Sequence, residues 1–280
     1  IYRGLQDAKA CVRYFRADAS GANTYKIDPN KVIVGGQGTG GYIAVNYISL
    51  DKPAEINLPK FLSGVTDPAY GFVAGQSYVN QAVLGDFDGY GGIPQLNNPN
   101  NSVGFPNNVQ FAFNLGGALG DSTWLEPGDA PTVAMHVVGD PFAPYSTGIV
   151  FVPGNPPQSV VDVIGSQKII QFANQYGNND CFKNAGFQDP YTLAANNYNG
   201  GLDGLYPFVT VPAVQAGPWE WYDSTTVVNG ANALGQNGVG IWSNSLLTNP
   251  DMSKNKGLAY IDTVMNYLNP RIVYCLNLPT

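Results

Sequence analysis

The apolar positions near the start of the chain recur at helical spacing. Leu5, Ala8, Val12 and Phe15 stand at i, i+3, i+7 and i+10, which predicts an amphipathic helix over about 4–17. The turn-forming stretch GANTYKIDPN ends it. Further along, KVIVGG predicts a buried strand, GGYIAVNYISL a helix with an apolar face, and VQFAFNLGG and PTVAMHVVGD two more strands.

The second half of the chain has two further segments with helical periodicity. Residues 159–176 (SVVDVIGSQKIIQFANQY) place Val163, Ile169, Ile170 and Ala173 on one side, which predicts a helix over the whole segment. A last helix is predicted to carry Leu258, Ile261, Met265 and Leu268 and to end at the proline-containing segment 269–271.

Two regions rich in Gly, Asn and Pro, about 51–108 and 177–250, are predicted to be long loop insertions. ALGDSTWLEPGDA is predicted to be a loop or a short helical turn. Strands that alternate with helices indicate an α/β fold with a parallel sheet. We therefore expect one domain over 1–280.

The composition limits the classes of function. Hydrophobic residues make up 44% of the 280 residues, charged residues only 12%, and the formal net charge is −7 with 13 Lys and Arg. This excludes the electrostatic footprint of a nucleic-acid-binding protein and a polybasic membrane patch. No apolar run reaches the length of a bilayer span. The acidic, lysine-poor composition favours an extracellular protein, and the abrupt opening IYRGLQDAKACV is expected of a mature or trimmed product.

The three cysteines share no metal-ligand spacing. One interpretation is a disulfide between Cys181 and Cys275, with Cys11 unpaired on an apolar helix face. The other is three buried thiols. Both stay open at the level of sequence.

The glycine cluster GGQGTGG lies between a predicted strand and a predicted helix. Many hydrolases mount a nucleophilic serine on such a turn, in the pattern G-x-S-x-G, but this chain has Gly38 at the serine position. A dinucleotide-binding loop is the competing interpretation. It is disfavoured because residues 39–42 do not complete that pattern and no acidic residue ends a clear second strand.

A longer stretch, LQDAKACVRYFRADASGANTYKIDPNKVIVGGQGTGGYIA, resembles the carboxylesterase/lipase branch of the α/β-hydrolase fold. That branch has a D-x-x-A-A-x-R-x-x-R helix, then IDPxRI, then G-G-D-S-A-G-G. The chain is most similar to the esterase-like proteins that Bacteroidetes secrete through the type IX system, which implies a location outside the cell or on its surface. YIDTVMNYLNPRIVYCLNLP resembles their last helix and the start of their sorting-domain linker.

The segment MHVVGDPFAPY resembles the H-G-x-x-D-x-x-V-P-Y segment of that family. The resemblance places Asp140 at the position of the triad acid and His136 at a structural histidine. It also implies that the first strands of the sheet and the oxyanion loop precede the helix with which this chain opens. The strand KVIVGG would then have an unpaired edge, so a further segment of the polypeptide or a partner would complete the sheet.

Two departures from the family pattern bear on catalysis. Gly38 has no side chain, and Gln37 and Thr39 would point elsewhere on such a tight turn. NGGLDGLYPF, which corresponds best to the region of the family's general base, contains no histidine, and His136 is the sole histidine of the chain. The triad is degenerate, which argues against an enzyme.

Two smaller motifs each have a structural and a functional interpretation. In GDFDGYGG, Asp86 and Asp88 suggest a calcium loop, but an Asx/Gly turn is favoured because a bidentate Glu is missing. In GPWEWYDS, Trp219, Trp221 and Tyr222 would form a sugar or protein contact platform if exposed, and a loop anchor, which we favour, if buried.

The sequence therefore predicts a catalytically inactive α/β-hydrolase-like protein that serves in binding or assembly, with no cofactor unless calcium binds. One alternative is an active serine hydrolase that uses an atypical nucleophile, Ser122 or Thr39, with His136 and Asp140, or residues supplied by a partner. A second alternative is a carbohydrate-binding surface protein that uses the tryptophan cluster.

Overall fold

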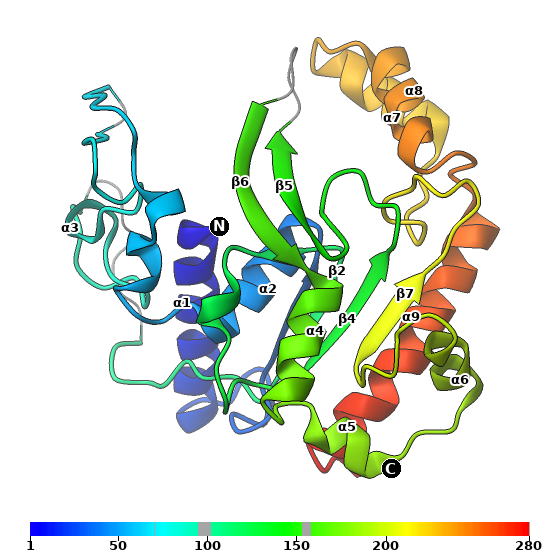
Figure 1. The fold of residues 1–280 in the computed structure, drawn as a ribbon, viewed down its shortest axis with the longest axis horizontal. Coiled ribbons are helices and arrows are strands. Elements are labelled where there is room, and N and C mark those ends of the chain that lie inside the picture. The colour runs from blue at the N-terminus through cyan, green and yellow to red at the C-terminus, as the bar shows by residue number, and fades with distance from the viewer. Residues whose placement is uncertain (70, 95–101, 153–157, 280) are drawn as a thin grey trace.

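The computed structural model describes residues 1–69, 71–94, 102–152 and 158–279. Its centre is a parallel sheet of the strands β1 (Ile33–Gln37), β2 (Phe111–Leu115), β4 (Thr132–Val137) and β7 (Leu205–Phe208). They lie in the order β1-β2-β4-β7 (Figure 1). Val34 of β1 lies opposite Ala112 of β2, and His136 of β4 lies opposite Pro207 of β7. The predicted α/β class with a parallel sheet is confirmed.

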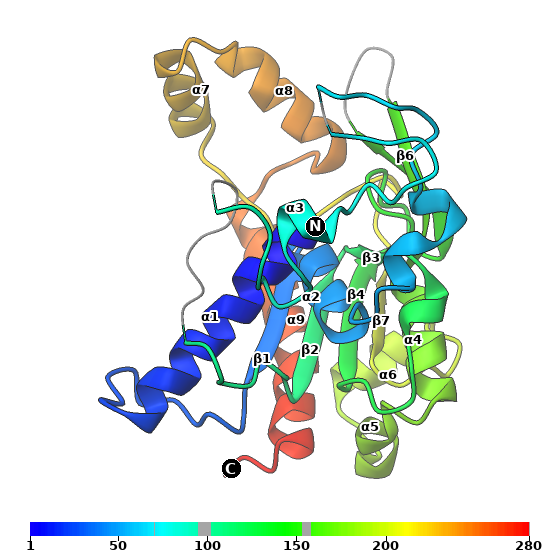
Figure 2. The same ribbon diagram turned by 90° about the vertical axis from the view of Figure 1, so that its left-hand side faces the viewer.

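Helices cover both faces of this sheet. On one face, α1 (Tyr2–Ser20), α2 (Thr39–Ser49) and α4 (Ser166–Gln175) share an apolar core that includes Leu5, Val45 and Ile169. On the other face, α9 (Lys254–Cys275) contributes Val264 and Leu268 to a second core, with α5 (Asp180–Ala185) and α6 (Pro190–Asn196) beside it. Figure 2 shows α9 running behind β1 and β2.

Two hairpins rise above the carboxyl ends of the parallel strands (Figure 1). One consists of β5 (Thr147–Val152) and β6 (Gln158–Gly165), which with β3 (Ala118–Leu119) form an antiparallel sheet in the order β3-β6-β5. The other pairs the helices α7 (Ser224–Ala233) and α8 (Gly238–Thr248). The remaining short helices are η1 (Glu55–Asn57), η2 (Pro59–Phe61), α3 (Gln81–Leu84) and η3 (Ser122–Trp124).

The helix predicted over 159–176 is wrong in its first half. Residues up to Gly165 form β6, because the β-branched run SVVDVIG pairs antiparallel with β5. Val163 is buried, as predicted, but it belongs to this strand and not to a helix. The helix begins only at Ser166. Ile169, Ile170 and Ala173 are the buried face of α4, as predicted.

The predicted insertion over 177–250 is also corrected, because it contains α5, α6, α7, α8 and the sheet strand β7. The described part of 51–108 holds η1, η2, α3, turns and two isolated β-bridges, as expected of a loop region. ALGDSTWLEPGDA includes the short strand β3 besides the helical turn η3.

The last helix does not end at 269–271 but continues through Pro270 to Cys275. A proline inside a helix forfeits one backbone hydrogen bond. Contacts on both sides of Pro270 hold the helix together: Arg271 Nη1 donates to the Tyr267 carbonyl at 2.6 Å, and Cys275 forms a disulfide with Cys181 of α5. The disulfide interpretation is confirmed, while Cys11 is exposed rather than placed on an apolar face.

Candidate functional site

The turn from β1 to α2 is built around glycines that permit very close approach. A Cβ on Gly36 would lie 2.4 Å from the carbonyl carbon of Gly40, and a Cβ on Gly41 would lie 2.3 Å from Asn114 Oδ1. Gly38, between strand and helix, has φ 53° and ψ −119°, a conformation that side-chain-bearing residues rarely adopt. Its amide donates to the Leu115 carbonyl at 2.8 Å.

A cavity of about 670 Å³ opens above this turn. A Cβ on Gly38 would meet no atom within 4 Å, so the turn exposes backbone alone to the cavity. The walls come from α2, the segment 50–79 with η1 and η2, η3, the two hairpins and the loop after β7, and they are mainly aromatic and aliphatic. Aromatic wall residues include Tyr42, Phe61, Trp124, Phe151 and Trp219.

Asp140 lies after β4 and lines this cavity together with Gly38, so the structure brings these two predicted positions into one site. Its Oδ1 accepts hydrogen bonds from the amides of Phe142 (2.7 Å) and Ala143 (3.1 Å). These two amides fix the carboxylate in a turn. Burial, aided by the negative charge of Asp140, raises the pKa of Tyr42 to about 12.

His136 does not line the cavity and is fully buried within β4. Its Nδ1 lies 2.7 Å from Ser166 Oγ, and its Nε2 lies 3.1 Å from the Ala143 carbonyl and 3.6 Å from Asp140 Oδ2. Because both ring nitrogens face protein partners inside the core, the imidazole cannot accept a proton from a group at Gly38. This geometry fits the structural histidine expected from sequence.

The loop after β7 contributes Glu220 to the cavity, a residue that our sequence reasoning passed over. Its carboxylate accepts a hydrogen bond from Gln37 Nε2, directly before Gly38. Its backbone is fixed at both ends, since its amide donates to the Gly217 carbonyl (2.8 Å) and its carbonyl accepts from Asn249 Nδ2 (2.7 Å). Burial raises the pKa of Glu220 above its usual value, and the Gln37 bond opposes that rise.

The tryptophan motif around Glu220 is divided between two surroundings. Trp219 is 8% exposed, packs against Phe208 and lines the cavity, which fits the anchor interpretation. Trp221 lies under Lys254, whose Nζ is 5.0 Å from the ring centroid, and Tyr222 is exposed. The three rings therefore form no common platform. The closeness of Trp219, Trp221 and Tyr222 in the sequence marks this segment, but it does not point to Glu220.

The two alternative nucleophiles also occupy different places. Thr39 begins α2 and lines the cavity. Ser122 begins η3 and is not among the residues that line it. Neither residue is hydrogen-bonded to His136, whose ring partners are Ser166 and Ala143.

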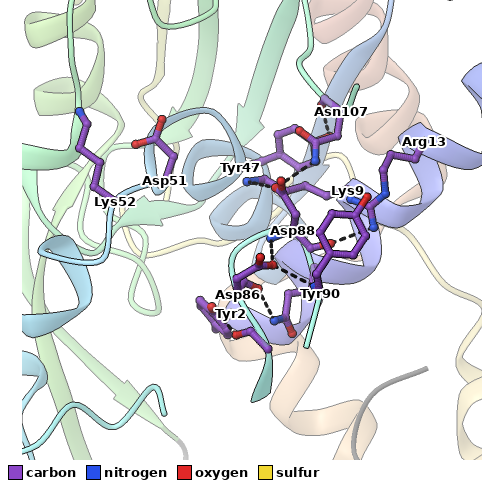
Figure 3. A network of polar contacts seen from close by, with 12 residues as sticks. Tyr2, Lys9, Arg13, Tyr47, Asp51, Lys52, Asp86, Asp88, Tyr90 and Asn107 are labelled. Carbon is purple, nitrogen blue, oxygen red and sulfur yellow. Dashed lines mark hydrogen bonds and ion pairs between the residues drawn. The ribbon is translucent and has the colours of Figure 1, made fainter. Parts of the chain in front are cut away.

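The suspected calcium loop is an Asx turn held against α1 (Figure 3). Asp86 Oδ1 accepts from the amides of Asp88 and Tyr90, each at 2.9 Å. Asp88 Oδ1 lies 3.2 Å from Lys9 Nζ and accepts from Asn107 Nδ2 at 3.0 Å. Within the described residues there is no group of three or more His, Cys, Asp or Glu side chains arranged to hold a metal.

Comparisons with known proteins return no match: no family model, no curated protein and no solved structure is similar to this chain. None of the described helices combines the length and apolarity needed to cross a membrane.

Proposed function

We propose that this chain is a catalytically silent binding or assembly protein with an α/β-hydrolase-like architecture. The observation that carries the proposal is Gly38: the sharp turn between β1 and α2 opens into a large cavity but carries no side chain. Acyl transfer on such a turn needs a hydroxyl or thiol activated by a base. His136 is enclosed elsewhere and Asp140 alone cannot supply that chemistry.

The arrangement of the sheet supports the hydrolase-like part of the proposal. Four parallel strands in chain order carry the glycine turn after the first, Asp140 after the third and the Glu220 loop after the fourth. The glycine turn and Asp140 stand in the order expected from the sequence resemblance. The segment that the resemblance matches to the general base, 199–208, ends in β7 itself, and the loop that follows carries Glu220 hydrogen-bonded to Gln37.

An assembly role is supported by the free edge of β1. The Val32 carbonyl and the Gly38 amide both face β2, so alternation along a strand directs the polar backbone groups of Ile33, Gly35 and Gln37 away from the sheet. Among the described residues no strand pairs with that edge. An unpaired parallel edge is a template for one more strand.

The flank of α9 nearest to that edge has a complementary apolar surface. Tyr260 and Tyr267 pack against Phe208 and Tyr206 of β7, so the opposite flank of the helix faces the β1 side. That flank carries Leu258, Ile261 and Met265, which are 47%, 38% and 45% exposed. A strand added beside β1, from a further segment or a partner, would lie next to this surface. A location outside the cell belongs to the same proposal, and the Cys181–Cys275 disulfide is compatible with it.

Activity assays test the silent site directly. The purified chain is expected to hydrolyse no p-nitrophenyl ester above the rate of buffer and to take up no fluorophosphonate label. In Gly38→Ser the side chain would meet open space but would strain the backbone at φ 53°, and the variant should gain no turnover because His136 is enclosed elsewhere. Turnover by the natural chain that is lost in Thr39→Val, Ser122→Ala or His136→Gln would overturn the proposal.

Amide exchange tests the free edge. In the isolated chain, the amides of Ile33, Gly35 and Gln37 should exchange much faster than those of Val34 and Gly36, which face β2. In the assembled protein purified from its source, the first three should become protected. Equal protection of both sets in the isolated chain would show that the edge is not open.

A further inference from the structure

The cavity above Gly38 has an unusual balance of charge. Two carboxylates, Asp140 and Glu220, line it, whereas no lysine, arginine or histidine side chain is among its described lining residues. Lys60, which lies over the lining residue Phe61, is already paired with Asp121 and Asp162 at 2.8 and 3.0 Å. Neither carboxylate has a lysine or arginine partner among the described residues, and the ring nitrogen beside Asp140, His136 Nε2 at 3.6 Å, is buried in the core.

The rest of the wall suits the apolar part of a ligand. Trp124 and Trp219 are more than nine-tenths buried, and Phe61, Phe151 and Val163 add further apolar surface. Aromatic faces attract cations as well as hydrocarbon, because the ring quadrupole is negative over the face. At about 670 Å³, the cavity lies within the usual range for small-molecule sites.

The position of Glu220 depends on a glycine. Gly217 has φ 58°, and a Cβ on it would lie 3.0 Å from Glu220 Cδ and 3.2 Å from Glu220 Oε1. Together with the bonds from Gln37 and Asn249, this leaves room for the carboxylate to lie within the cavity wall. The carboxylate is thus held in place instead of extending into solvent.

We propose that the cavity above Gly38 binds a small molecule with an apolar body and an ammonium or amine head, and that Glu220 is the residue that selects the cationic head. The inference rests on the proposed function, in which the site binds rather than reacts. It deepens that function by naming the ligand class. Ligands with a carboxylate or phosphate head are excluded, because Glu220 and Asp140 would repel them.

Calorimetric titration with three molecules that share one decyl chain tests the proposal. Decyltrimethylammonium should bind about tenfold or more tightly than decanol, and decanoate should bind most weakly. In Glu220→Gln, which keeps the shape of the side chain, the preference of the cation over decanol should fall to within about twofold. Glu126→Gln, which changes an exposed carboxylate outside the cavity, should preserve the preference.

A second variant tests the position of the Glu220 carboxylate separately from its charge. Gly217→Ala should displace the Glu220 carboxylate and reduce the preference for decyltrimethylammonium while leaving decanol affinity within about twofold. Decanoate binding as tightly as the cation, an unchanged preference in Glu220→Gln, or no binding of any of the three would overturn the inference. Failure of the proposed function has a different signature, namely turnover of esters or fluorophosphonate labelling.

Discussion

The acidic loop at 85–92 and the carboxylate of Glu220 show two different surroundings for negative charge in one protein. Asp86 and Asp88 are engaged by backbone amides, by Asn107 and by Lys9, and Arg13 donates to the Asp88 carbonyl at 2.8 Å. Figure 3 shows these groups converging on one side of α1. Glu220 has a single neutral side-chain partner, Gln37, and faces an apolar cavity.

The two regions differ in whether the fold itself provides a partner for each carboxylate. In the 85–92 loop, every charge has a partner from α1 or from the loop, so the cluster fastens a long loop to a helix. At Glu220 the carboxylate is partly buried and has no lysine or arginine beside it, which is unfavourable unless a ligand compensates. The motif with more acidic residues is therefore structural, and the single carboxylate between two tryptophans is the better candidate for binding.

The largest expected effect is on stability, from Arg13→Ala. Arg13 is 1% exposed, its Nη2 bonds the Asp88 carbonyl, and its guanidinium lies 4.7 Å from the centroid of the Tyr90 ring. Losing these contacts and opening a void should lower the free energy of unfolding by about 3 kcal/mol. Urea denaturation followed by circular dichroism measures it.

Lys52→Ala is the matched control, since Lys52 pairs with Glu126 on the surface where both side chains are about half exposed. It should lower the free energy of unfolding far less than Arg13→Ala does, because solvent screens an exposed ion pair. If Arg13→Ala is as mild as this control, the 85–92 loop is not fastened by α1.

How far the sequence predicts this molecule varies along the chain. The helices around Leu5 and Ala44 follow from helical periodicity, because each buries one face, and the strands β1, β2 and β4 follow from their short apolar runs. The apolar residues of β6 also fit a 3.6-residue period, so the sequence predicts a helix there, and only the pairing with β5 decides between the two. At Pro270 the sequence predicts a helix end, because the contacts that let the helix continue, made by Arg271 and Cys275, depend on the fold.

The candidate site was predicted only in part. Gly38 and Asp140 could be placed together because both follow strands, and parallel strands end at the same edge of a sheet. Glu220 could not be found in this way, since it lies on a loop after β7, a strand that the loop-rich composition of 177–250 concealed. Its burial and its bond to Gln37 depend on the fold and leave no mark in the local sequence.

A second prediction concerns His136→Asn, a variant that distinguishes a structural from a catalytic role of this histidine. His136→Asn should lower the free energy of unfolding by about 2 kcal/mol, because the shorter side chain cannot reach both Ser166 Oγ and the Ala143 carbonyl. Decyltrimethylammonium affinity per folded molecule should change by less than about twofold. Denaturation and calorimetry measure the two quantities, and a stable variant that has lost binding would assign His136 to the ligand site.

A third prediction uses pH to compare two partly buried carboxylates. Burial raises the pKa of Asp129 to about 6 and raises that of Glu220 in the same direction. A raised carboxyl pKa means that the native state holds the proton more tightly than the unfolded state. Stability is therefore present below the unfolded pKa and falls as pH rises from about 4 through about 6.

For Asp129 the loss should be on the order of 1 kcal/mol, since the residue is only partly buried and solvent screens its charge. Asp129→Asn should flatten this part of the profile, measured by urea denaturation at a series of pH values. Saturating decyltrimethylammonium should offset only the part due to Glu220. A cation that also removed the Asp129 contribution would mean that it acts away from the cavity.

The smallest expected effect is that of calcium on the 85–92 loop. Asp86 is committed to two backbone amides and Asp88 to Lys9 and Asn107, so a cation would have to displace bonds that the fold already makes. A site whose dissociation constant is no tighter than about 1 mM stabilises the native state by at most about 0.4 kcal/mol at about 1 mM calcium. The melting temperature measured by calorimetry should therefore rise by no more than about 1–2 °C.

A dissociation constant near 10 μM would instead give about 2.7 kcal/mol. A rise of several degrees that is abolished in Asp88→Asn would turn the structural loop into a second binding site, and the contrast with Glu220 would no longer hold.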